Sequence, residues 1–108
     1  FEPRSWSLRR NFFQDRLPAA LAGAEEIVIK DVYEKEKIPE AQRLSLEALR
    51  RDLEARGRTV RVFPGYPEIE DHLLAPGLDD PRVVILLSNG DVGEFCDWAR
   101  RLCASPGA

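Results

Sequence analysis

The chain has 108 residues, of which 44% are hydrophobic and 32% are charged, and its net charge is −3. This composition is typical of one soluble globular domain and excludes a disordered chain. The 16 basic and 19 acidic side chains are interleaved, which excludes a basic face for nucleic acid, and no apolar run approaches the roughly 20 residues of a membrane span.

The first half of the chain predicts helix and strand in alternation. A helix is predicted over residues 5–21 from apolar residues spaced four apart, and Pro18 inside it predicts a kink or a break. The next strand, residues 26–32, has a buried Ile-Val-Ile centre. The charged segment 33–43 then predicts a loop on the carboxyl side of that strand.

The second half continues the alternation. An amphipathic helix over 45–57 is followed by a strand over 59–63 and a helix that begins at Pro67. Five consecutive apolar residues within 82–87 predict the strongest strand, buried on both faces as in the middle of a parallel sheet. The last helix is predicted over 92–103.

This order of elements favours an α/β fold: a Rossmann-like three-layer domain with a mainly parallel sheet flanked by helices on both faces. We expect the domain to span residues 1–104 and a tail to span 105–108. Residues 1–5 read as the exit of a strand, because Pro3 cannot continue a central strand. We therefore expect most of the first strand of the domain to be missing.

The two cysteines predict no cross-link. Cys96 and Cys103 lie seven residues apart on one predicted helix, a separation of about 10 Å, which is too far for a disulfide. Reduced thiols fit a cytoplasmic location. A metal site would need more ligands than these and the single histidine, His72, so no metal site is predicted.

Four segments are expected to meet at the carboxyl edge of the sheet, where α/β folds bind ligands: residues 4–5, 34–37, 64–66 and 88–91. Arg4 is the sharpest candidate, because a guanidinium at a strand exit beside a helix N-terminus suits a carboxylate or a phosphate. The alternative is a surface arginine paired with a local acid.

The turn Ser88-Asn89-Gly90 is the second candidate. Gly90 permits a positive φ, and free N–H groups at the start of the following helix can hold an anion or a carbonyl oxygen. The alternative is a tight connection with no ligand, and the turn lacks the phosphate-loop pattern. Lys37 lies in a run of charges that can equally be a solvated surface. His72 has no nucleophile or acid in a defined relation to it, so no catalytic residue is predicted.

Three motifs carry a family resemblance. They are Phe1-Glu2-Pro3-Arg4-Ser5 with the following Arg9-Arg10, the loop 36–40, and the turn 87–90. In this order they resemble the C-terminal domain of the Mur ligase family, and the first and third are closest to the branch that ligates a murein tripeptide. The chain departs from that branch at Trp6-Ser7, where Asn-Thr is common, and at 91–94, where Gly-Phe-Gly-Gly is usual.

The resemblance implies an ATP-dependent amide ligase that joins UDP-N-acetylmuramate to a murein peptide through an acyl phosphate, in peptidoglycan recycling or biosynthesis. It implies that ATP and Mg²⁺ are bound mainly by a central domain and the UDP-sugar by an N-terminal domain of the same chain. It also implies that the C-terminal domain lacks its first helix and most of its first strand here. This fragment alone would then be inactive; it would position the peptide acceptor and close on ATP.

For the site residues, the resemblance implies that Arg4 and Ser5 hold a substrate carboxylate or the phosphate end of the site. Ser88, Asn89 and Gly90 would bond the far end of the peptide, and Lys37 would approach the same anionic groups as Arg4. The alternative hypothesis is a non-catalytic Rossmann-like domain for binding or interaction.

Overall fold

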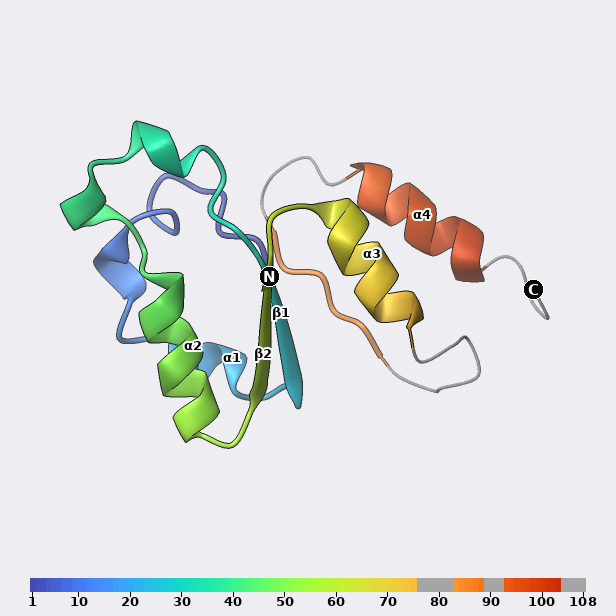
Figure 1. Cartoon of the computed structure of the whole chain (residues 1–108), viewed down its shortest axis with the longest axis horizontal. Helices are drawn as coiled ribbons and strands as arrows, with labels where there is room; N and C mark the ends of the chain where they lie inside the picture. The colour runs from blue at the N-terminus through green and yellow to red at the C-terminus, as the bar shows by residue number, and fades with distance from the viewer. Residues whose placement is uncertain (76–82, 89–92, 104–108) are drawn as a thin grey trace.

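A computed structural model of the chain describes residues 1–75, 83–88 and 93–103. Figure 1 shows two central strands side by side, with helices on either side of them. The described elements are, in chain order, the 3-10 helix η1 (Asn11–Phe13), α1 (Leu17–Leu21), β1 (Glu26–Lys30), the 3-10 helices η2 (Lys35–Lys37) and η3 (Glu40–Gln42), α2 (Leu46–Ala55), β2 (Thr59–Phe63), α3 (Tyr66–Leu74) and α4 (Gly93–Cys103).

β1 and β2 form a parallel pair in which Glu26 aligns with Thr59 and Lys30 with Phe63. The predicted strand over 59–63 is confirmed to the residue, and the one predicted over 26–32 ends two residues early. Because α2 connects the two parallel strands, they form a βαβ unit. The predicted α/β class is thus confirmed, and this small sheet flanked by helices is compatible with a Rossmann-like domain.

The first three residues extend this sheet beside β1. The backbone nitrogen of Phe1 donates to Val28 O at 2.8 Å, and Lys30 N donates back to Phe1 O at 3.0 Å. On the other side, Glu2 N donates to Leu87 O at 3.0 Å. Residues 1–3 therefore lie between β1 and the segment 83–88, so that two segments far apart in the sequence lie side by side.

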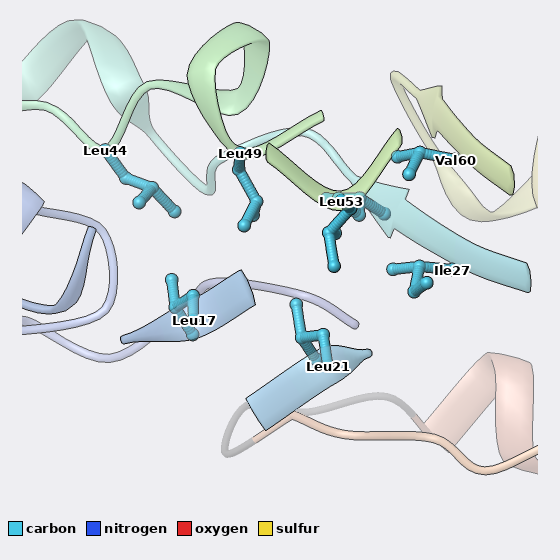
Figure 2. Packing of buried hydrophobic residues seen from close by; sticks show 8 residues of the cluster. Leu17, Leu21, Ile27, Leu44, Leu49, Leu53 and Val60 are labelled. Atoms are coloured by element: carbon cyan, nitrogen blue, oxygen red, sulfur yellow. The ribbon is translucent and has the colours of Figure 1, made fainter. Parts of the chain in front are cut away.

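The apolar core lies between the sheet and the helices α1 and α2 (Figure 2). Leu49 and Leu53, one turn apart on α2, face the sheet and are fully buried. Ser45 caps that helix, because its Oγ accepts from Ala48 N at 3.1 Å. The buried members of the core cluster are Leu17, Leu21, Ile27, Ile29, Leu44, Leu49, Leu53 and Val60.

The predicted helix over residues 5–21 is wrong in its extent. Only η1 and the five-residue α1 form there, and Pro18 lies in the first turn of α1. Proline has no N–H to donate to the preceding turn, so a helix can begin at Pro18 but cannot pass through it. Leu44 N bonds to Arg9 O instead, at 3.1 Å, which ties this irregular stretch to the loop before α2.

The predicted buried strand over 82–87 is wrong for residues 83–87, the part that the structure describes. These residues have no strand geometry, and Val83 and Ile85 are 88% and 74% exposed. The neighbouring segment, residues 1–3, is only three residues long, and its Pro3 has no backbone N–H to donate. Among the described residues, no strand longer than this segment pairs with 83–87 through backbone hydrogen bonds, and most apolar side chains of this run are exposed.

The three remaining helices match the predicted positions. α2 starts after its expected cap, Ser45, α3 starts at Tyr66, one residue before the expected Pro67, and α4 buries Phe95 as its apolar stripe predicts. The free thiol of Cys96 is partly buried on α4. The predicted tail, 105–108, lies outside the described residues. None of the helices that the structure describes is long and apolar enough to cross a membrane.

Candidate functional site

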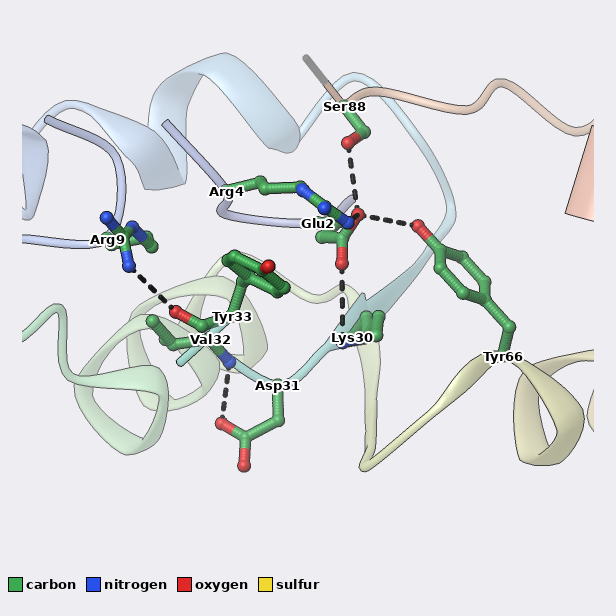
Figure 3. Close-up of polar contacts among 9 residues, drawn as sticks. All are labelled: Glu2, Arg4, Arg9, Lys30, Asp31, Val32, Tyr33, Tyr66 and Ser88. Atoms are coloured by element: carbon green, nitrogen blue, oxygen red, sulfur yellow. Dashed lines mark hydrogen bonds and ion pairs between the residues drawn. The ribbon is translucent and has the colours of Figure 1, made fainter. Parts of the chain in front are cut away.

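A buried carboxylate organises the carboxyl edge of the sheet (Figure 3). Glu2 is 1% exposed, and its Oε1 accepts hydrogen bonds from the Tyr66 hydroxyl at 2.8 Å and the Ser88 hydroxyl at 3.1 Å. Its Oε2 lies 3.3 Å from the ammonium of Lys30. We call Glu2, Arg4, Lys30, Tyr66 and Ser88 the Glu2 cluster.

The fold explains why these residues meet. Lys30 ends β1, and Tyr66 begins α3 directly after β2. Glu2 lies on the adjacent strip of the sheet, and Ser88 ends the segment that bonds to this strip. Parallel strands bring their carboxyl ends to one edge, so residues far apart in sequence contact one another there.

The cluster satisfies the buried charge. A carboxylate removed from water is costly unless it is bonded or paired, and here two hydroxyls donate to Oε1 while the Lys30 ammonium lies 3.3 Å from Oε2 as its counter-charge. Burial of Tyr66, and then its bond to Glu2, raise the pKa of the Tyr66 hydroxyl well above its usual range. Tyr66 therefore remains a hydrogen-bond donor at neutral pH.

Arg4 is held in place without using its hydrogen bonds. Its guanidinium lies 4.0 Å from the centroid of the Tyr33 ring, and Nη1 lies 4.0 Å from Glu2 Oε1. The side chain is 25% exposed, and it donates no hydrogen bond to any residue within the described part of the chain. A stacked guanidinium with open donors is suited to a planar anion from outside the chain.

Arg9 supports the same ring from another side. Its Nη1 donates to Tyr33 O at 3.2 Å, and its guanidinium carbon lies 5.9 Å from the Tyr33 centroid. Ser5 has a local role as well, because its Oγ accepts from Leu8 N at 3.0 Å and closes the turn after Arg4. Both contacts orient the segment that carries Arg4.

Lys37 forms an ion pair with Glu34. Its ammonium lies 2.6 Å from Glu34 Oε2, and the side chain is largely exposed. Hydrogen bonds from Lys37, and then from Tyr33, hold the pKa of Glu34 below its usual range. Lys37 thus joins the site only indirectly, through Glu34 and Tyr33.

The structure brings together some of the predicted site residues. Arg4 and Ser88 both meet Glu2, and Ser5 adjoins Arg4 in sequence. Lys37 is placed one contact further away, and Asn89 and Gly90 lie outside the described residues. Among the described residues, no three histidine, cysteine, aspartate or glutamate side chains converge as a metal site would require.

Sequence reasoning gave no role to Glu2, Lys30 or Tyr33, although Glu2 stands inside the first motif. The segment of Tyr66 was expected at the edge, without a role for its hydroxyl. A signal was present in the sequence: Glu2 is an acid between two residues of apolar character at a strand exit. A buried acid needs a cation beside it, and Lys30 at the end of β1 is the nearer of two, at 3.3 Å against 4.0 Å for Arg4.

Comparison with known proteins points to one enzyme family. The UDP-N-acetylmuramate–L-alanine ligases of Stenotrophomonas maltophilia strains K279a and R551-3 are each 31% identical to this chain over 93 residues. The match covers 86% of this chain and 19% of each ligase, so the chain spans about a fifth of their length. No protein-family model and no solved structure matches the chain. The similarity supports a relation to the Mur ligases and does not single out the tripeptide branch.

Proposed function

We propose that this chain is the acceptor-binding domain of an ATP-dependent Mur-type ligase, which joins the carboxylate of UDP-N-acetylmuramate to the amine of a murein peptide. The similarity to two ligases of this kind supports the proposal. The observation that carries it is Arg4, a stacked and partly exposed guanidinium at the carboxyl edge of the sheet. A murein peptide ends in carboxylates, which are the groups that such a guanidinium binds.

The role of this chain is positioning. In the ligase reaction, ATP with Mg²⁺ supplies the phosphoryl group that activates the muramate carboxylate as an acyl phosphate. We propose that ATP and Mg²⁺ are bound mainly by another domain of the protein, as in the family that the sequence resembles. Arg4 holds a carboxylate of the peptide, and Ser88, Asn89 and Gly90 bond the far end of the peptide, so that the peptide amine faces the acyl carbon when the domains close.

The acceptor that we propose is the tripeptide L-alanyl-γ-D-glutamyl-meso-diaminopimelate. The Phe-Glu-Pro-Arg-Ser and Ser-Asn-Gly motifs favour it. The two similar ligases are named for L-alanine, which makes L-alanine the competing acceptor. Use of the tripeptide would place the protein in peptidoglycan recycling.

The test is a ligation assay on the full-length protein that carries this chain. It would be supplied with UDP-N-acetylmuramate, ATP and Mg²⁺, and with the tripeptide, the corresponding tetrapeptide or L-alanine. Phosphate release and the amide product would both be measured. Turnover with the tripeptide supports the proposal. Turnover with L-alanine alone would show that L-alanine, and not the tripeptide, is the acceptor. Absence of ATP-dependent turnover with any acceptor would overturn it and favour a non-catalytic binding domain.

A further inference from the structure

The two oxygens of the Glu2 carboxylate have different partners. Oε1 accepts from the hydroxyls of Tyr66 and Ser88, which are neutral. Oε2 is buried, accepts no hydrogen bond of good geometry from any described residue, and lies 3.3 Å from Lys30 Nζ. Lys30 is thus the cation that compensates the Glu2 charge.

Arg4 is the cation left over. Its Nη1 is 4.0 Å from Glu2 Oε1, beyond hydrogen-bond distance, and Tyr33 holds the guanidinium from the other side. One negative and two positive groups leave the cluster with one net positive charge. Glu2 pairs with Lys30 at 3.3 Å and with Arg4 only at 4.0 Å, so an anion that reaches Arg4 meets a cluster whose net charge is plus one.

We propose that the buried Glu2–Lys30 pair sets the charge of the acceptor site, so that the site selects a singly charged carboxylate over a doubly charged phosphate-like group. This inference rests on the proposed function and adds a basis for its specificity. Glu2 and Lys30 are positioning residues here, because they act through Arg4 and do not touch the ligand. The ligand class is a peptide with a free carboxylate.

The pair offers substitutions that remove one charge at a time. Glu2→Gln keeps an oxygen for the two hydroxyls and leaves Lys30 uncompensated, which raises the net charge of the cluster to plus two. Lys30→Gln leaves Glu2 uncompensated, so that Glu2 draws in Arg4 and the net charge falls to zero. The double variant Glu2→Gln/Lys30→Gln restores plus one.

The experiment compares two acceptors on the full-length wild-type protein and these three variants. One acceptor is the tripeptide, and the other is the same tripeptide with a phosphonate in place of its C-terminal carboxylate, at a pH where the phosphonate is doubly ionised. Glu2→Gln should improve phosphonate binding relative to carboxylate binding by about tenfold, the effect of one hydrogen bond to a charged group. Lys30→Gln should raise the KM for the tripeptide with little change in kcat, and the double variant should return to the wild-type preference.

Equilibrium binding of both peptides, measured on the same proteins, separates this inference from the proposed function. Failure of the wild type to ligate any acceptor would overturn the proposed ligase function. The relative affinities for the two peptides would still test whether the Glu2–Lys30 pair sets the charge of the site. An unchanged preference in Glu2→Gln, or a double variant that binds worse than both single variants, would show that the pair is only structural. If Glu2→Gln does not fold, the tripeptide affinity of Lys30→Gln decides, and an unchanged value overturns the inference.

Discussion

The Ser88 hydroxyl donates a hydrogen bond of 3.1 Å to the carboxylate of Glu2, which lies 86 residues earlier in the chain. This contact joins the first strip of the sheet to the segment before α4. It brings Glu2 of the first sequence motif and Ser88 of the third motif together in the Glu2 cluster (Figure 3). The bond also means that Ser88 is oriented by Glu2 before any ligand arrives.

Replacing Glu2 by alanine should destabilise the protein by about 3–5 kcal/mol, because Lys30 would remain mostly buried without its counter-charge. The free energy of unfolding, measured with urea, checks this value. Glu36→Ala is the matched control, since Glu36 is exposed and its loss should change stability by no more than about 0.5 kcal/mol. Equal effects of the two substitutions would contradict the buried role of Glu2.

Two isoleucines test where the core lies. Ile29 on β1 is 0% exposed, and Ile29→Ala should cost about 2–5 kcal/mol of unfolding free energy. Ile85 belongs to the run whose sequence predicts a buried strand, yet it is 74% exposed. Ile85→Ala should therefore cost no more than about 0.5 kcal/mol. A large loss at Ile85 would mean that the run is buried in solution.

The stability of the protein should fall at alkaline pH because of Tyr66. Its pKa is raised in the folded protein above the unfolded value of about 10, first by burial and then by Glu2. A group with a raised folded pKa contributes stability that is fully present below the unfolded pKa and is lost as the pH rises through the folded pKa. Urea unfolding of wild type and Tyr66→Phe, at neutral pH and above pH about 10, measures the difference.

At neutral pH, Tyr66→Phe should be less stable than wild type by about 1–3 kcal/mol, because the bond to the Glu2 carboxylate is lost. The gap between the two proteins should narrow as the pH rises, since only wild type loses the tyrosine contribution. A gap that stays constant with pH would show that Tyr66 ionises no differently in the folded and unfolded states.

Arg4→Ala should raise the KM for the peptide acceptor at least about tenfold in the full-length ligase, because a charged hydrogen bond to the acceptor is removed. Arg4→Lys should recover little of this loss, since an ammonium neither stacks on Tyr33 as well nor presents a planar pair of donors. Arg50→Ala is the control, because Arg50 is exposed on α2 and pairs with Glu54. If Arg4→Ala has the wild-type KM for the peptide acceptor, Arg4 does not bind the acceptor.

The fold was predictable where a local pattern and the tertiary environment agree. The apolar spacing of α2 and its Ser45 cap predict that helix, and the structure confirms both. The pattern failed at 83–87, because an apolar run records a capacity for burial and not the presence of a covering partner. It failed again at residues 5–16, where spacing alone could not show that the helix starts only at the turn containing Pro18.

The sequence by itself determined the α/β class, the positions of the central strands and the motif that carries Arg4, because periodicity and residue type are local properties. The tertiary structure adds that Glu2 is buried, that Lys30 pairs with it and that Arg4 stacks on Tyr33 while staying partly exposed. Those facts depend on contacts between residues distant in sequence, such as Glu2 with Tyr66 and Ser88. The net charge of a site is the sum over the charged groups that are neighbours in space, and the order of residues along the chain does not show which groups these are.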